Sequence, residues 1–219
     1  MVFLDRSDAG RRLAGALKQY RGTDTVVLAL PRGGVPVGFE IAIALGLPLD
    51  IIVARKLGAP GHPEFAIGAI AQGVVYLSPH AAEWLGGMPD YVERRARAET
   101  LEMERREQAY RGDAPPTPVA GRTVILVDDG LATGATAIAA ARAVRQGGPR
   151  RIVLAAPVCA QASIPVLKAE VDDLVCLEAP ADFRAVGQFY LDFSPTTDGE
   201  VLRCLTAAAA RSSDGVGRR

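Results

Sequence analysis

Five short apolar runs without polar alternation lie along the chain, and each is typical of a strand buried on both faces. They cover residues 25–30, 49–54, 124–127, 152–156 and 174–177. Segments with helical start and stop signals separate these runs and cover residues 8–20, 35–45, 137–144, 162–168 and 199–210. Short strand, helix, strand connections favour parallel pairing. We therefore predict an α/β fold with a central, mostly parallel sheet flanked by helices.

A long excursion interrupts this alternation between residues 57 and 118. Glycine and proline recur in residues 57–64, which predicts an exposed and mobile loop. The apolar runs 65–71 and 74–77 flank Gln72-Gly73 and predict a hairpin. The excursion therefore adds a loop and a hairpin to the main sheet.

The second half of the excursion is strongly charged, and residues 90–110 predict a helix. Glu93 precedes Arg97, and Glu102 precedes Arg106, at the i,i+4 spacing of helical ion pairs. The interleaved acids favour a solvated face for the arginines, with a lid or a partner surface as the alternative. Three prolines in residues 113–118 predict a rigid connector back to the sheet.

The 219 residues fit one domain, which we place at residues 1–211. Within it, residues 57–118 form the insertion, and residues 180–197, rich in Phe and Tyr, form a small segment that we call the hood. Residues 212–219 lack apolar anchors and are predicted to be disordered.

Charge and cysteine content exclude several classes of protein. Lys plus Arg equals Asp plus Glu at 25 each, so no global field favours nucleic acid or a membrane surface. The three cysteines are widely spaced in apolar surroundings and predict reduced core thiols. No basic segment with an apolar core opens the chain, and the apolar runs are too short to span a bilayer. We predict a cytoplasmic protein without nucleic-acid or membrane partners.

The most informative stretch is TVILVDDGLATGAT, residues 123–136. Asp128 and Asp129 follow a buried strand directly, at the sheet edge where open α/β folds bind ligands. The small-residue loop 130–136 then enters a helix, so its backbone N–H groups and the helix dipole suit a phosphate. Carboxylates alone would repel a phosphate. One ligand that satisfies both is a sugar phosphate whose hydroxyls meet Asp128 and Asp129.

Other phosphate and metal motifs do not fit. The loop 130–136 lacks the lysine and glycine spacing of a Walker sequence, and Gly33, Gly34 and Gly38 do not give the GxGxxG spacing of dinucleotide folds. His62 and His80 are isolated in the sequence and favour surface loop positions over catalysis or zinc binding.

The strand, Asp-Asp, loop and Thr-Gly-x-Thr order closely resembles the binding signature of type I phosphoribosyltransferases. Pro31-Arg32-Gly33-Gly34 resembles the pyrophosphate loop of that family, and Arg55-Lys56 resembles the cationic start of its flexible catalytic loop. Taken alone, the Asp pair could bind a metal or cap a helix, and Arg32-Gly33-Gly34 could be a simple turn. Arg55-Lys56 taken alone could be a solvated strand end. The joint placement of these elements at three predicted strand ends favours the functional interpretation.

The resemblance implies a role for each matched residue. Arg32, the Gly33 amide, Arg55 and Lys56 would surround the diphosphate of phosphoribosyl pyrophosphate. Asp128 and Asp129 would accept the ribose 2′ and 3′ hydroxyls. The 5′-phosphate would lie in the loop formed by Ala132, Thr133, Gly134, Ala135 and Thr136.

The resemblance further implies catalytic roles for Arg32, Lys56, Asp128 and Asp129. It implies Mg²⁺ carried mainly by ligand and water oxygens, with Asp128 and Asp129 contacting it indirectly. It also implies a cis peptide at Arg32-Gly33 and closure of residues 57–64 over the site.

The acceptor base is not identified by the sequence. Ala132 stands where 6-oxopurine enzymes of the family have an aspartate. Alanine at this position resembles adenine-type members of the family instead. By contrast, Phe183, Val186, Gly187 and Asp192 resemble the base-reading segment of the 6-oxopurine enzymes. A stacking ring could come from Phe183, Phe189 or Tyr190, with core packing as the equal alternative. A purine is favoured among the nitrogenous bases.

Three activities stay open from the sequence. The first is phosphoribosyl transfer, which the retained Arg32, Arg55 and Lys56 favour because their roles concern the leaving group. The second is a regulator that binds phosphoribosyl pyrophosphate or a nucleotide without turnover. The third is a sugar-phosphate hydrolase or phosphatase that uses a magnesium-bound Asp pair. A homodimer also remains open.

Overall fold

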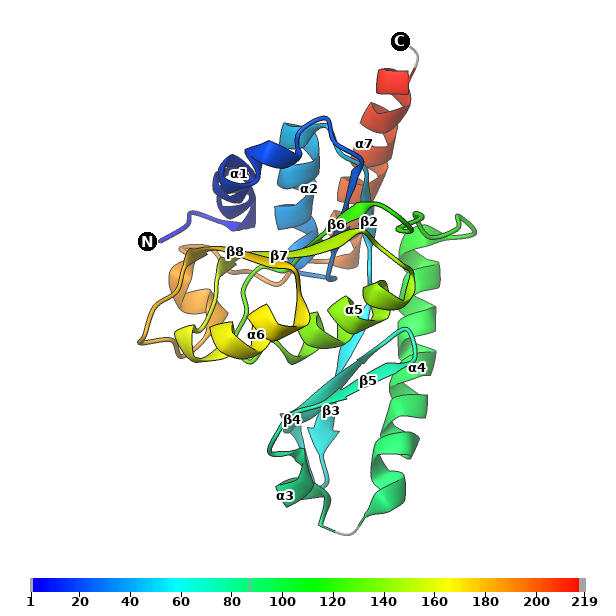
Figure 1. The fold of residues 1–219 in the computed structure, drawn as a ribbon, viewed down its shortest axis with the longest axis vertical. Coiled ribbons are helices and arrows are strands. Elements are labelled where there is room, and N and C mark those ends of the chain that lie inside the picture. The colour runs from blue at the N-terminus through cyan, green and yellow to red at the C-terminus, as the bar shows by residue number, and fades with distance from the viewer. Residues whose placement is uncertain (1, 87, 217–219) are drawn as a thin grey trace.

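The computed structural model describes residues 2–86 and 88–216 and contains a five-stranded parallel sheet (Figure 1). Its strands lie in the order β2-β1-β6-β7-β8. Their bounds are Thr25–Ala29 for β1, Leu49–Ile51 for β2, Thr123–Val127 for β6, Arg151–Val158 for β7 and Asp173–Glu178 for β8. The prediction of an α/β fold with a parallel central sheet is therefore confirmed.

Strands β1, β6 and β7 are buried on both faces, as their continuous apolar runs predicted, whereas the edge strand β8 is half-buried along its length. Val26 and Leu28 of β1 pack beneath α5 (Ala135–Gln146) and α6 (Ile164–Glu170) on one face. Val27 packs on the other face with α1 (Arg6–Ala16) and α2 (Gly34–Leu45). Successive side chains point to opposite faces of a strand. A strand covered by apolar helices on both faces therefore shows no alternation of apolar and polar residues.

The strand order creates a switch point between β1 and β6. The chain leaves β1 toward β2 on one side, whereas β6 pairs with β1 on the other side. Ala29 is in register with Val127, so the segments that follow the two strands start level with each other. Ligands of open α/β sheets bind outside the carboxyl ends of the strands at such a point.

The helix ends differ slightly from the predicted ones. Asp5 caps α1 by accepting a hydrogen bond from the Asp8 amide, so the helix begins at Arg6, two residues before the predicted start at residue 8. The last helix, α7 (Asp198–Val216), continues through residues 212–216 of the segment predicted to be disordered. Residues 217–219 of that segment lie outside the described residues.

The excursion forms a second, antiparallel sheet, and the prediction of a loop at residues 57–64 is wrong. Strand β3 (Ala54–Ala59) pairs with β4 (His62–Ala71), and β4 pairs with β5 (Val74–Leu77). Burial of Leu57 and Ala59 beside Ile67 stabilises this pairing despite the local glycines and prolines. The predicted strand 49–54 is likewise two strands, and Arg55 and Lys56 lie within β3.

The predicted hairpin at Gln72-Gly73 is confirmed, with φ of 44° at Gln72 and 80° at Gly73. Positive φ at both central residues matches the twist of paired strands. The charged helix is also confirmed as α4 (Pro89–Arg111), which follows α3 (Ala81–Leu85). In Figure 1 the small sheet and the far end of α4 project from the central sheet.

The remaining elements are three 3₁₀ turns, η1 (Lys18–Tyr20), η2 (Gln161–Ser163) and η3 (Val186–Phe189). Cys159, Cys176 and Cys204 are free thiols in buried or half-buried positions, as predicted. Within residues 2–86 and 88–216, no helix is long and apolar enough to cross a membrane.

Candidate functional site

The two aspartates after β6 lie against the loop after β1, at the switch point of the sheet. A Cβ atom built on Gly33 would stand 2.0 Å from Asp129 Oδ2, and one built on Gly34 would stand 2.6 Å from the Val127 carbonyl oxygen. Real Cβ atoms do not approach other atoms so closely, so a side chain at position 34 would clash with the backbone, and one at position 33 would displace the Asp129 carboxylate. Asp128 Oδ1 accepts a hydrogen bond from the Asp129 amide at 2.9 Å.

Asp129 is held in place by Arg6, which the sequence did not indicate, and by Tyr190, which the sequence indicated only as a stacking ring. Arg6 Nε donates to Asp129 Oδ2 at 2.8 Å, and the Tyr190 hydroxyl donates to the Asp129 carbonyl oxygen at 2.6 Å. Arg6 is the first residue of α1, 123 positions before Asp129. No local pattern links residues so distant in sequence, and both contacts depend on the tertiary fold.

Burial dominates the electrostatics of the aspartate pair. Loss of solvent raises the pKa of Asp128 well above its usual range, and the neighbouring Asp129 raises it further, whereas Lys56 opposes the shift. Burial also raises the pKa of Asp129, against the lowering effect of Arg6. The pKa of Tyr190 is raised by burial and by the charge of Asp129, so its hydroxyl stays protonated as a donor at neutral pH.

We expect Asp128→Asn to make the protein more stable at neutral pH. Because the folded pKa of Asp128 lies above its unfolded value of about 3.9, the folded wild type binds more protons between those two values. The free energy of unfolding should therefore fall as pH rises through that window, then level off. Because asparagine cannot ionise, the variant should not show this fall in the free energy of unfolding.

Urea unfolding of both proteins between pH 3 and 8 tests the expectation. The two curves should converge at the acid end, and the stability advantage of the variant should grow toward neutral pH. A difference independent of pH would contradict the assigned origin of the effect.

The loop that follows the aspartates is anchored at one end and open in the middle. The Leu131 amide donates to the Val158 carbonyl oxygen, and the Ala160 amide donates to the Leu131 carbonyl oxygen, both at 2.8 Å. Ala132 and Thr133 are exposed. Anchoring at Leu131 therefore fixes the loop while its centre faces solvent.

The helix α5 begins directly after this loop. Gly134 adopts a left-handed φ of 72° at the N-cap, and a Cβ there would stand 2.4 Å from Leu167. The Thr133 hydroxyl accepts from the Ala135 amide at 3.5 Å, and Thr136 lies in the first turn of the helix. Amides in a first helical turn have no intrahelical partner, so this end of α5 can receive an anion.

The predicted cations have different surroundings. Arg32 is exposed, with Nη1 3.8 Å from Asp198 Oδ1. Arg55 Nε donates to the buried Glu99 of α4 at 2.8 Å, and Arg95 donates to the other oxygen of the same carboxylate. Lys56 is exposed and forms no ion pair within the described residues. The cis peptide lies at Pro31-Arg32, one bond before the predicted position.

The predicted base-binding residues of the hood are divided between core and surface. Phe189 and Tyr190 are buried in a cluster with Phe3. Phe183 is half-buried and stacks on Phe189 with 5.5 Å between ring centroids.

The other two predicted base-binding residues lie at the edge of the hood. Val186 packs against Gly130, where a Cβ would stand 2.4 Å from the valine side chain. Asp192 is exposed and accepts hydrogen bonds from the amide and hydroxyl of Ser194. Of the predicted aromatics, Phe183 thus keeps the most accessible ring.

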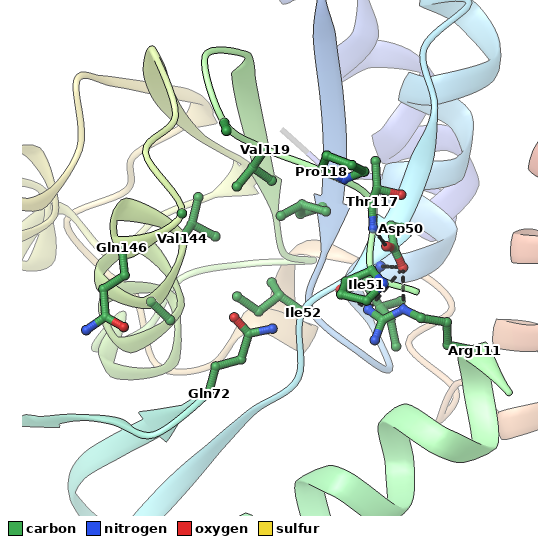
Figure 2. A pocket seen from close by; sticks show the side chains of 15 residues that line it. Asp50, Ile51, Ile52, Gln72, Arg111, Thr117, Pro118, Val119, Val144 and Gln146 are labelled. Carbon is green, nitrogen blue, oxygen red and sulfur yellow. Dashed lines mark hydrogen bonds and ion pairs between the residues drawn. The ribbon is translucent and has the colours of Figure 1, made fainter. Parts of the chain in front are cut away.

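A separate cavity of about 510 Å³ lies near the amino-terminal end of β6 (Figure 2). Its apolar wall includes Ile52, Val119 and Val144, while Asp50 and Arg111 lie at its margin. Arg111 donates to Asp50 Oδ1 at 3.2 Å and to the Ile51 carbonyl oxygen at 3.0 Å. These charged groups satisfy each other, so the pair has a structural role joining α4 to β2.

Replacing Arg111 with methionine should lower the free energy of unfolding by about 3 kcal/mol, because it leaves the Asp50 charge buried without its partner. The side chains of Arg111 and Asp50 are only 12% and 11% exposed. Arg105→Met is the matched control on the same helix, since Arg105 is 66% exposed and pairs with Glu102. Urea unfolding should separate the two variants, and equal losses would contradict a buried pair.

Comparisons with known proteins agree with this architecture. Residues 4–194 match the profile of the Phosphoribosyl transferase domain family. A protein of Mycobacterium tuberculosis strain H37Rv, named as a "putative phosphoribosyl transferase", is 44% identical over 211 residues, which are 94% of this chain and 47% of that protein. The chain therefore spans about half the length of the curated relatives it matches.

Solved structures are also similar. The crystal structure of TT1426 from Thermus thermophilus superposes with a TM-score of 0.79 at 45% identity, covering 94% of this chain and 99% of that one. The AQ2163 protein from Aquifex aeolicus, at 12% identity and a TM-score of 0.51, covers 91% of this chain and 86% of its own and shares the fold.

Proposed function

The chain belongs to the phosphoribosyl transferase domain family, and we propose on that basis that it is an enzyme that transfers the ribose 5-phosphate of phosphoribosyl pyrophosphate to a nitrogenous base and releases pyrophosphate. The observation that carries the proposal is the contact between the two aspartates and the Gly33-Gly34 loop at the switch point of the sheet. The carboxylates, the loop 130–136 and the second glycine loop then lie together at one edge of the sheet, as binding of a sugar with phosphates at two positions requires.

Each part of this candidate site has a proposed role. Asp128 and Asp129 accept hydrogen bonds from the ribose 2′ and 3′ hydroxyls. The amides of the loop 132–136 and the Thr133 and Thr136 hydroxyls bind the 5′-phosphate. The open centre of the loop and its position before α5 support this assignment.

The reaction breaks the bond between C1 of the ribose and the diphosphate, and forms a bond from C1 to a ring nitrogen of the base. Positive charge develops on the ribose in such a transition state, as in other glycosidic cleavages. The carboxylates of Asp128 and Asp129 offset that charge. Arg32, Lys56 and the Gly33 amide stabilise the negative charge that builds on the leaving diphosphate.

The family resemblance implies Mg²⁺, and the residues of this candidate site are suited to that ion. Among residues 2–86 and 88–216, no group of three or more His, Cys, Asp or Glu side chains could hold a metal ion alone. Mg²⁺ ordinarily keeps several waters and binds one or two carboxylates together with phosphate oxygens. Asp128 and Asp129 would therefore contact it through water or the ligand. When bound, the ion neutralises charge on the diphosphate.

For the acceptor we propose a purine as the first candidate, with the hood as its site. The half-buried ring of Phe183 and the exposed Asp192 are the residues available there, since Phe189 and Tyr190 are used in the core. Ala132 offers no side chain for proton exchange with a base.

Incubation of the protein with Mg²⁺, phosphoribosyl pyrophosphate and a panel of nucleobases tests the proposal. Pyrophosphate should appear only when the accepted base is present. Each base should also be tested without phosphoribosyl pyrophosphate to exclude background release.

One observation favours a second candidate, a regulator that binds the same ligand without turnover. The guanidinium of Arg55, which was expected to stabilise the leaving diphosphate, is paired with the buried Glu99 instead. Tight binding of phosphoribosyl pyrophosphate with no pyrophosphate release for any base would support this candidate over the enzyme.

A further inference from the structure

The first residues of the described chain meet the hood beside the aspartate pair. The Phe3 amide donates to the Phe189 carbonyl oxygen at 2.8 Å, and the Leu191 amide donates to the Phe3 carbonyl oxygen at 2.9 Å. The Phe3 ring also packs on Tyr190, with 5.4 Å between centroids. Pairing of the first residues with the hood therefore fixes the start of α1 next to the site.

Arg6, the first residue of α1, is restrained from three directions. Its Nε donates to Asp129 Oδ2 at 2.8 Å, and its Nη1 donates to the Ser194 carbonyl oxygen at 2.7 Å. Its guanidinium carbon lies 4.0 Å from the centre of the Phe193 ring. The Arg6 and Asp129 side chains are only 12% and 15% exposed. A largely buried, stacked guanidinium holds its partner in one geometry, unlike a mobile surface pair.

Arg6 also lies next to the glycine loop. A Cβ on Gly33 would stand 3.2 Å from Arg6 Nε as well as 2.0 Å from Asp129 Oδ2. The guanidinium is therefore adjacent to both the glycine loop and Asp129. Among the described residues, Arg6 is the one cation that forms an ion pair with Asp128 or Asp129.

We propose that Arg6 is a positioning residue for phosphoribosyl pyrophosphate, which fixes the Asp129 carboxylate for the ribose and offsets the charge of the aspartate pair as the anionic ligand enters. This inference rests on the proposed function. Two ionised carboxylates would repel a ligand with three phosphates, and the repulsion is strong where solvent is excluded. A fixed cation at 2.8 Å from one carboxylate reduces that repulsion without needing to touch the substrate.

The experiment compares Arg6→Gln and Arg6→Lys with the wild type. Calorimetry with Mg²⁺ and phosphoribosyl pyrophosphate gives Kd, steady-state kinetics give KM and kcat, and thermal unfolding reports the fold. Arg6→Gln should raise Kd and KM for phosphoribosyl pyrophosphate at least tenfold while leaving the KM of the base within twofold. Arg6→Lys keeps the charge and should recover part of that loss.

Arg12→Gln is the matched control. Arg12 lies on the same helix, pairs with Asp8 at 2.8 Å and has its guanidinium carbon 5.5 Å from the centre of the Phe3 ring, but it does not contact Asp129. This variant should bind phosphoribosyl pyrophosphate within twofold of the wild type. An equal loss in the Arg12 and Arg6 variants would overturn the inference, because it would indicate a general effect of disturbing α1.

A folded Arg6→Gln variant that binds phosphoribosyl pyrophosphate as the wild type does would also overturn it. If Arg6→Gln does not fold, Arg6→Lys decides. Binding at least threefold weaker at unchanged thermal stability supports the inference, and unchanged binding overturns it. Failure of the wild type to bind phosphoribosyl pyrophosphate would instead refute the proposed function, so the two failures are distinguishable.

Discussion

Asp128→Asn combined with Asp129→Asn should lower phosphoribosyl transfer by about 1000-fold or more, because it removes both carboxylates that we propose offset the positive charge of the ribose. The fold should survive, since asparagine matches the shape of aspartate and the pKa of both carboxyls is already raised by burial. The measurement is pyrophosphate release with the accepted base, together with binding of phosphoribosyl pyrophosphate. Both should be lost while thermal unfolding remains cooperative.

A second Asp-Asp pair in the chain provides the control. Asp172 and Asp173 stand at the amino end of β8, at the opposite edge of the sheet, where they pair with Arg145 and Arg151. Asp172→Asn with Asp173→Asn removes the same charge and should leave transfer within about twofold, as surface substitutions generally do. If the variant of Asp128 and Asp129 retains binding and turnover, the site is wrongly assigned.

Gly33→Ala should lower transfer by about 100-fold or more, because the added methyl group displaces the Asp129 carboxylate, for which we propose a catalytic role. Gly33 has φ of −62° and ψ of −34°, which any residue can adopt, so the backbone conformation permits alanine. The obstacle is contact, since the new Cβ would stand 2.0 Å from Asp129 Oδ2 and 3.2 Å from Arg6 Nε. Asp129 must therefore move and lose its alignment.

Gly15→Ala is the control for this substitution. Gly15 lies in α1, and a Cβ added there would meet no atom within 4 Å, so alanine should stabilise the helix by about 0.5–1 kcal/mol without changing transfer. Steady-state kinetics and urea unfolding of both variants make the comparison. Full activity of Gly33→Ala would show that Asp129 needs no fixed position beside the loop.

Several elements of the fold were predictable because they depend on local patterns. The runs at β1, β6 and β7 are apolar throughout, which predicts strands covered on both faces, and the intervening helices predict parallel pairing. Strand β3 and the beginning of β4 at residues 62–64 were not predictable in the same way. Glycine and proline indicate turns locally, whereas burial of Leu57 and Ile67 in the shared cluster with α4 outweighs that preference.

The candidate site likewise has a part that local sequence patterns predict and a part that only the tertiary fold brings together. Asp128, Asp129 and the loop 130–136 are adjacent in sequence, so one strand end brings them together wherever the strand lies. The Gly33 loop could be joined to them because parallel strands place their carboxyl ends at one edge. Arg55 could not be judged from sequence, because its partner Glu99 is 44 positions away on α4.

The sequence by itself therefore determined the parallel sheet, the placement of the aspartate pair and the loop 130–136 after a strand, and the family, since each is carried by a contiguous pattern. Only the tertiary structure decided which side chains support that site. Arg6 and Tyr190 reach Asp129 from opposite ends of the chain, and the aromatic residues of the hood are mostly used to hold those ends together. Contacts between such distant residues leave no periodicity or spacing in a single sequence, because packing of the folded chain alone brings them together.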